Sequence, residues 1–327
     1  MSRRTTMERI LVTGAVGQIG SELTMALREK HGPQNVVAAG HRTAPSKQLL
    51  ESGPFERIDV SNKESVAAAI AKHDIDTVYH MAAVLSAVGE GNPSLCWDVN
   101  MNGLKNVLDV AVERDLTRVF VPSSIAVFGA GIPLDQTPND TVLKPSTMYG
   151  VTKVAGELLA EYYVKRFDLD CRGVRYPGII SHETLPGGGT TDYAVAIYYD
   201  AVIKGSYECF VREDTVLPMM YMPDAIKATL DIMEAPFENL RHHCDFNVSA
   251  MSFSAGELAA NIRKHIPHFT CTFKPDFRQA IADSWPNSMD DTPARSEWGW
   301  SPAYDLDAMT QDMLSALRWK HEQGLVG

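Results

Sequence analysis

The sequence predicts an α/β fold in which a doubly wound parallel sheet is followed by a smaller mixed domain. Short apolar, β-branched runs alternate with helical patterns in the first half of the chain, at residues 10–12, 36–39, 77–79, 118–121 and 172–175. Past residue 178 the alternation stops, and a Pro-Gly-Gly-Gly loop, several helices and recurrent prolines follow. We therefore expect one domain over residues 1–178 and a second over 179–327. A segment near 220–250 should return to the main sheet, with 246–248 as its strand.

Two helix starts agree with this periodicity. Ser61 and Glu64 have the spacing of a capping box and predict a helix through about Lys72. Asn92 and Pro93 predict the start of another helix, which runs to about Arg114.

Composition excludes several classes of protein. The 327 residues are 45% hydrophobic, which is enough for a large core, and the net charge of −11 opposes nonspecific binding to nucleic acid or to an anionic membrane surface. No apolar run approaches the length of a membrane span, and no secretion signal is recognisable. The five cysteines are odd in number and scattered, and the histidines at 242, 243, 265 and 268 lack partners at ligand spacing. We expect a cytoplasmic protein without a metal.

The first strand is followed by a glycine-rich turn at residues 13–20 (TGAVGQIG). At a strand-to-helix junction, Gly14 permits a tight turn, Gly17 lets the backbone approach a pyrophosphate, and Gly20 lets the helix pack on the strand. This context predicts a Rossmann-type dinucleotide site, in which Gln18 and Ile19 would also contact the cofactor. The alternative is a tight βα turn that binds nothing.

A tyrosine and a lysine four residues apart, Tyr149 and Lys153, form the second motif. On a helix they share one face, with β-carbons roughly 5–6 Å apart. A tyrosine has an ordinary pKa of about 10, and a neighbouring ammonium favours its phenolate, which is a general base. The alternative is a surface pair without a role.

With these motifs, the chain resembles the extended branch of the short-chain dehydrogenase/reductase superfamily over nearly its whole length. The resemblance also rests on residues 80–83, Asn100, 123–129 and 298–302. Within the branch, four stretches look like those of the L-threonine 3-dehydrogenases: 175–181, 185–195, 217–222 and 282–286.

The resemblance implies oxidation of the β-hydroxyl of L-threonine to 2-amino-3-oxobutanoate. Tyr149 would take the hydroxyl proton, Lys153 would lower the pKa of Tyr149 and hold the nicotinamide ribose, and Ser124 would orient the hydroxyl. Ser123 and Ser124 can also simply end a strand, and the choice of Ser124 follows from the pattern of the branch.

The resemblance implies NAD as the cofactor, with NADP as the alternative. NAD-dependent members usually end their second strand with an acidic residue, but Gly40 stands at that place here. His41 and Arg42 can tolerate a 2′-phosphate, although an arginine there can also stack on adenine. Asp59 and Val60 would contact the adenine. Further cofactor contacts are expected at Met81, Ala82, Ala83, Asn100, Tyr176 and Ile179.

Substrate contacts are expected in the glycine loop. Gly187, Gly188, Thr190 and Thr191 offer backbone N–H groups and hydroxyls that suit a carboxylate, although the loop can also be a connection that binds no ligand. The two further candidates are Ser86, which would make a polar contact, and Trp285, which would close the pocket or belong to the core.

Two other functions remain open. A nucleotide-sugar epimerase or dehydratase with tightly bound NAD would share the motifs, and Arg212 and Arg241 are its candidate diphosphate ligands. A noncatalytic dinucleotide-sensing protein is opposed by the intact Tyr149, Lys153 and Ser124. The branch also implies a homodimer that pairs through two helices of each subunit, roughly residues 93–114 and 149–167.

Overall fold

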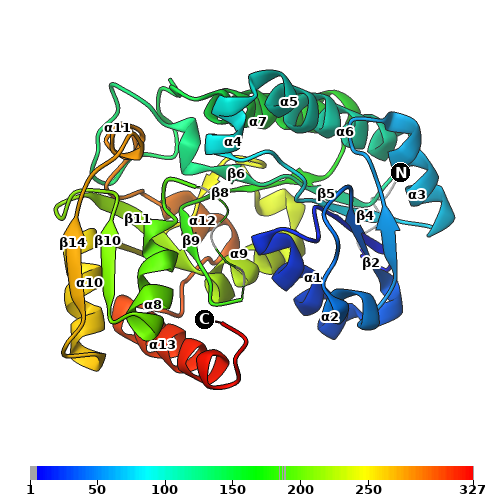
Figure 1. The fold of residues 1–327 in the computed structure, drawn as a ribbon. Helices are drawn as coiled ribbons and strands as arrows, with labels where there is room; N and C mark the ends of the chain where they lie inside the picture. The colour runs from blue at the N-terminus through cyan, green and yellow to red at the C-terminus, as the bar shows by residue number, and fades with distance from the viewer. Residues whose placement is uncertain (1–5, 184, 186, 188, 327) are drawn as a thin grey trace.

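The centre of the molecule is a six-stranded, all-parallel sheet in the order β3-β2-β1-β4-β5-β7 (Figure 1). The computed structural model describes residues 6–183, 185, 187 and 189–326. The strand order reverses between β1 and β4, where the carboxyl ends of the strands leave a crevice for a ligand. The strands of this sheet are β1 (Ile10–Thr13), β2 (Val36–Gly40), β3 (Phe55–Arg57), β4 (Thr77–His80), β5 (Arg118–Phe120) and β7 (Cys171–Arg172).

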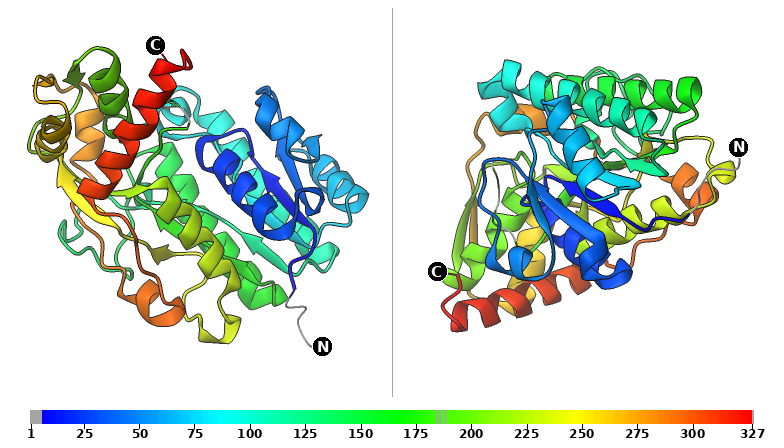
Figure 2. Two further views of the ribbon diagram at one scale, coloured as in Figure 1. Left: turned by 90° about the horizontal axis from the view of Figure 1, so that it is seen from below. Right: turned by 90° about the vertical axis from the view of Figure 1, so that its right-hand side faces the viewer.

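Both faces of the sheet are covered by helices, so strands such as β1 and β2 are buried on both sides (Figure 2). Ile10 and Val12 of β1 join a core with α1 (Gln18–His31) and α9 (Met222–Glu234), while Leu11 faces a second core. That second core contains α3 (Lys63–Lys72), α6 (Gly103–Glu113) and α7 (Met148–Phe167). Burial on both faces explains why β1 reads as a continuous apolar run. These observations confirm the predicted Rossmann-type fold.

A third core lies in the C-terminal half, beneath the mixed sheet β13-β11-β9 and the parallel pair β10-β14. Tyr193, Tyr198 and Leu314 are among its fully buried side chains. The elements of this core are β9 (Gly178–Ile180), α8 (Tyr193–Ile203), β10 (Ser206–Cys209), β11 (Val216–Tyr221), β13 (Met251–Ser254), α10 (Ala255–His265), β14 (Thr270–Phe273), α11 (Arg278–Ala282) and α13 (Leu306–Glu322). Helix α12 (Thr292–Trp298) packs instead against the core that contains α1 and α9.

A small parallel sheet, β12-β8-β6, continues the main sheet towards this half. Its strands are β6 (Ser123–Ser124), β8 (Val174–Tyr176) and β12 (Phe246–Asn247). The segment predicted to return, 246–248, thus pairs with β8 rather than with a strand of the six-stranded sheet. The domain boundary at residue 178 stays a prediction. The short helices are η1 (Pro33–Asn35), α2 (Lys47–Glu51), α4 (Ser86–Gly91), α5 (Pro93–Trp97), η2 (Asp98–Asn102), η3 (Ile125–Val127) and η4 (Phe237–Asn239).

Three local predictions differ from the structure. The capping box at Ser61 is wrong, because Asn62 caps α3 by accepting a hydrogen bond from Ser65 N, and Ser61 donates to Asp59 instead. The strand predicted at 172–175 is interrupted at Gly173, whose N–H bonds to His243 O. The helix predicted from Pro93 to Arg114 contains a turn of π-helix, η2.

No helix in the described part of the chain combines the length and apolarity needed to cross a membrane.

Candidate active site

The glycine turn between β1 and α1 leaves no room for side chains. Gly14 has a φ of +66°, and a Cβ there would stand 2.6 Å from Ala82 N. A Cβ on Gly20 would collide with the carbonyl oxygen of Gly14. The backbone is therefore bare at the N-terminus of α1, as the approach of a dinucleotide pyrophosphate requires.

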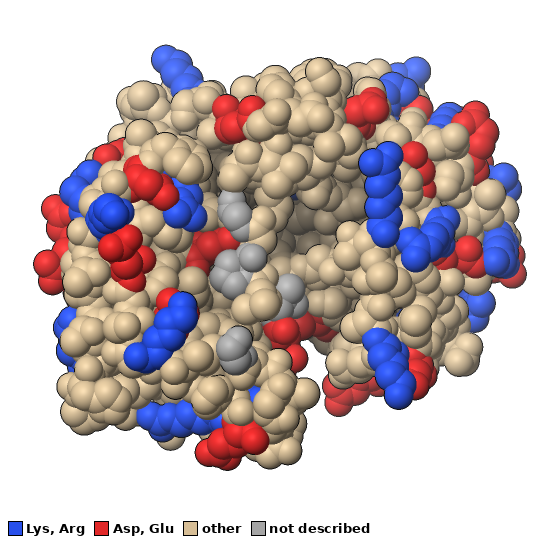
Figure 3. Space-filling view, in the orientation of Figure 1, with Lys and Arg blue, Asp and Glu red and all other residues tan. Residues whose placement is uncertain are grey.

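Two adjoining cavities open along the carboxyl ends of the strands, on either side of this turn. They share Gly14, Gly17, Met81 and Ala83 and have volumes of about 300 Å³ and 240 Å³. The space-filling view shows this face of the molecule hollowed at its middle (Figure 3). The first cavity, on the β2 side, includes His41, Arg42, Asp59, Val60 and Ala82. The second includes Gln18, Ile19, Gly20, Ser86, Ser124, Tyr149, Lys153, Tyr176, Ile179, Thr190, Thr191 and Trp285.

Tyr149, Lys153 and Ser124 converge on the second cavity. Tyr149 and Lys153 lie one turn apart on α7, which begins at the Thr147 cap, and Lys153 Nζ is 5.5 Å from the centre of the Tyr149 ring. Lys153 Nζ also donates to Pro122 O at 2.7 Å. The Ser124 hydroxyl hydrogen-bonds to the Tyr149 hydroxyl, and it accepts from Ala126 N at 3.2 Å. The three side chains can therefore act on one hydroxyl group.

Burial opposes ionisation of both groups of the pair. It raises the pKa of Tyr149 to about 12, although the hydrogen bond from Ser124 acts in the opposite direction. It lowers the pKa of Lys153 to about 8, while the carboxylate of Glu157 raises it. Lys153 therefore stays largely protonated near neutral pH. It is not among the groups that shift the pKa of Tyr149 here, so its predicted lowering of that pKa stays a prediction.

Sequence reasoning missed Glu157, which lies one turn beyond Lys153 on α7 and is buried. Its carboxylate accepts two hydrogen bonds of 2.8 Å from Arg175, and a third from the hydroxyl of Ser123. Burial raises the pKa of Glu157, and the guanidinium opposes that effect; the bidentate geometry favours an ionised pair. The four-residue spacing from Lys153 was the only signal in the sequence.

Asn100 lies behind the cleft and not on its wall. Its side chain accepts from Val84 N at 2.7 Å and donates to Val84 O at 3.0 Å and to Thr152 at 3.1 Å. Asn100 thereby fixes the loop after β4, which carries Met81 and Ala83 into the cleft. The residue predicted to contact the cofactor is thus placed to hold the residues that line its cavity.

The second cavity is lined by Ser86, Thr190, Thr191 and Trp285, for which substrate contact stays a prediction, and by Asp192, which sequence reasoning missed. One carboxylate oxygen of Asp192 accepts from Gly189 N at 2.6 Å. Gly187 does not line the cavity, and Gly188 lies outside the described residues. Hydroxyl groups and a carboxylate therefore stand beside Tyr149, as a small polar molecule with an ammonium group would require.

The profile of the NAD dependent epimerase/dehydratase family matches residues 10–249. The chain belongs to this family. An uncharacterized epimerase/dehydratase of Staphylococcus haemolyticus is 49% identical over 97% of this chain and 99% of the relative.

Solved structures of similar members have the same fold over nearly their full length. The L-threonine dehydrogenase of Clostridium difficile is 51% identical, with a TM-score of 0.94 over 98% of this chain and 99% of its own. A monomeric L-threonine 3-dehydrogenase from a metagenome is 50% identical, with a TM-score of 0.91 over 95% of this chain and 99% of its own. The extended short-chain dehydrogenase/reductase assignment is thereby confirmed.

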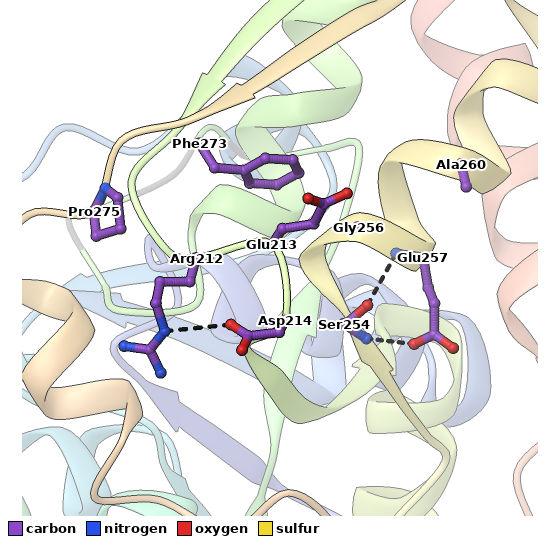
Figure 4. Close-up of a pocket in the computed structure, with 9 residues that line it drawn as sticks. All are labelled: Arg212, Glu213, Asp214, Ser254, Gly256, Glu257, Ala260, Phe273 and Pro275. Carbon is purple, nitrogen blue, oxygen red and sulfur yellow. Dashed lines mark hydrogen bonds and ion pairs between the residues drawn. The ribbon is translucent and has the colours of Figure 1, made fainter.

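A nucleotide-sugar substrate of an epimerase/dehydratase would need cationic groups for its diphosphate. Arg212 instead lines a separate open pocket of the C-terminal half, where it pairs with Asp214 (Figure 4). It also pairs with Asp283. Arg241 lines another cavity, near His242. Neither arginine lines the cleft. The two residues considered as diphosphate ligands therefore do not supply a cationic group there.

Asp140, His242 and Asp245 form one group whose ligand atoms lie within 4.8 Å of one another, although their spacing in the sequence did not indicate it. His242 Nδ1 is 2.9 Å from Glu297 and Nε2 is 3.5 Å from Asp140. Burial lowers the pKa of His242, but the bond to Glu297 and the nearby carboxylates outweigh it and raise the pKa overall. The raised pKa favours a positive charge on His242 between these carboxylates, and the group lies outside the cleft.

Proposed function

We propose that the protein is an NAD-dependent L-threonine 3-dehydrogenase that oxidises the β-hydroxyl of L-threonine to 2-amino-3-oxobutanoate. The observation that carries the proposal is the position of Ser124, Tyr149 and Lys153 on a small cavity walled by Thr190, Thr191 and Asp192. The identity of about half the residues to L-threonine dehydrogenases over nearly the full chain supports it.

The proposed site places each substrate group against a matching protein group. Thr190 and Thr191 donate hydrogen bonds to the substrate carboxylate, and Asp192 accepts from its ammonium. Ser124 binds the β-hydroxyl, and Tyr149, as the phenolate, removes the hydroxyl proton. Lys153 stabilises that phenolate with its positive charge.

The cofactor would lie along the two joined cavities. The turn at Gly14, Gly17 and Gly20 would hold the pyrophosphate, and Lys153 and Tyr176 would lie on the nicotinamide side. A bound nicotinamide supplies the acceptor for the hydride that leaves the β-carbon. Trp285 is only 7% exposed and would exclude water from the reacting atoms.

The proposal is tested by mixing the purified protein with NAD⁺ and with L-threonine as the only substrate. Formation of NADH is measured by the absorbance of its nicotinamide ring. We expect steady NADH formation that requires both compounds. No reduction with threonine, together with NAD that stays bound through purification, would instead favour a nucleotide-sugar epimerase or dehydratase.

We also propose that the protein is a cytoplasmic homodimer. The cysteines at 96, 171, 209, 244 and 271 are all free, as a reducing compartment would keep them. On α7, Val151, Leu158 and Tyr162 are exposed at helical spacing, and Leu95 and Trp97 of the neighbouring α5 extend the same apolar surface. These helices are the ones predicted to pair.

Leu158→Glu is expected to convert the dimer into a monomer, because Leu158 is 68% exposed and a carboxylate would be buried without a partner in the interface. Light scattering after gel filtration measures the mass. Leu50→Glu, on the exposed face of α2, is the matched control and should leave the dimer intact. The metagenomic relative is described as monomeric. If the wild-type protein also elutes as a monomer, the proposed dimer is refuted.

A further inference from the structure

The end of β2 forms one wall of the adenosine side of the cleft. The cavity of about 300 Å³ there is lined by Gly40, His41, Arg42, Thr43 and Asp59, among others. Of the described residues that line it, Asp59 carries the single carboxylate. The acid that usually receives a ribose 2′-hydroxyl at the end of the second strand is therefore missing.

Packing under β2 opposes an acid at this position. A Cβ on Gly40 would stand 3.1 Å from Val16 Cγ1 and 3.2 Å from Phe55 Cζ, so both side chains would have to move to accommodate it. Phe55 and Val16 pack against one of the sheet's cores. A side chain at residue 40 would therefore require shifts of a few tenths of an ångström in Val16 and Phe55.

The remaining carboxylate is already engaged. Asp59 accepts from Ser61 N at 3.0 Å and from Ser61 Oγ at 2.6 Å through one oxygen, and its other oxygen is 3.8 Å from His41 Nε2. The hydrogen bond from Ser61 is the main reason why the pKa of Asp59 is lowered, and the charge of Arg42 acts in the same direction. One oxygen of Asp59 is therefore engaged by Ser61, while the other has only the longer contact with His41.

Cationic groups gather at the same place. Arg42 lines the cavity and is exposed, and Arg57 Nη1 donates to His41 O at 2.5 Å, which holds a second guanidinium beside the loop. Two guanidinium groups with one engaged carboxylate leave an excess of positive charge for an anion.

We propose that the loop after β2 is a binding site for a ribose 2′-phosphate, with Arg42 as its principal ligand, so that the enzyme accepts NADP⁺ as well as NAD⁺. This inference rests on the proposed dehydrogenase function and deepens it by naming a second cofactor. Arg42 bonds to the phosphate oxygens, and the absence of an acid at residue 40 removes the repulsion that excludes NADP⁺ from NAD-specific sites.

Binding of adenosine 2′,5′-bisphosphate and of 5′-AMP to the whole protein tests this site by titration calorimetry. We expect the bisphosphate to bind at least as tightly as 5′-AMP. Arg42→Ala should lower the affinity for the bisphosphate about tenfold or more, because one charge-assisted contact is lost. The affinity for 5′-AMP should be nearly unchanged. Lys47→Ala removes an exposed cation of the following helix and is the matched control, expected to alter neither affinity.

Two results would overturn the proposal. If Arg42→Ala weakens both nucleotides equally, Arg42 stacks on the adenine and does not read the phosphate. If the wild-type protein binds the bisphosphate many times more weakly than 5′-AMP, the loop excludes the 2′-phosphate. Neither measurement needs threonine turnover, so a failure of the threonine assignment would be seen separately, in the reduction assay.

Discussion

Replacing Tyr149 with phenylalanine is expected to lower kcat/KM for L-threonine by about 10²–10⁴-fold, the usual contribution of a general base. Ser124 hydrogen-bonds to the phenol of Tyr149, and the ammonium of Lys153 lies near its ring. The substitution removes only the phenol oxygen. The aromatic ring remains to pack between the core and the cleft. Nicotinamide absorbance with L-threonine and NAD⁺ measures the loss.

Cofactor binding by the same variant should change little, since the glycine turn and Lys153 are untouched; quenching of tryptophan fluorescence by NADH checks this. Tyr162→Phe is the matched control, because Tyr162 lies on the same helix but does not line the cleft. A Tyr149→Phe variant that keeps most of its activity would disprove the assigned base.

Replacing Glu157 with glutamine is expected to lower the free energy of unfolding by about 3–5 kcal/mol, because it leaves the guanidinium of Arg175 buried without its counter-charge. A second effect is expected on catalysis. The carboxylate of Glu157 raises the pKa of Lys153, which burial lowers to about 8, so its removal should lower that pKa further. The alkaline limb of the kcat/KM profile should then move to lower pH, since Lys153 loses its proton earlier.

Urea unfolding measures the first effect, and rates between neutral and alkaline pH measure the second. Glu161→Gln, one turn further along α7 and partly exposed, is the control for both. If Glu157→Gln is destabilised but keeps the wild-type pH profile, Glu157 has only a structural role and does not act on Lys153.

Much of the fold was predictable from local patterns. Strands such as β1 are short, apolar and buried on both faces, and the glycine turn has steric requirements that the residues meet by themselves. The positions of Tyr149 and Lys153 on one helical face follow from their spacing alone. Helix α3 was predicted with its end correct, but its cap was misplaced by one residue, because Ser61 bonds to Asp59 instead.

The sequence by itself determined the short strands, the glycine turn and the tyrosine–lysine pair, since each depends on residues within a few positions of one another. Only the tertiary structure decided which partners surround them. Ser123, Glu157 and Arg175 come from β6, α7 and β8, and Asp192 joins the cleft from the start of α8. It also decided that Arg212 and Arg241 stay outside the cleft. Such contacts join residues that are distant in the chain, and burial, which sets the pKa values of the pair, arises only when the whole chain packs.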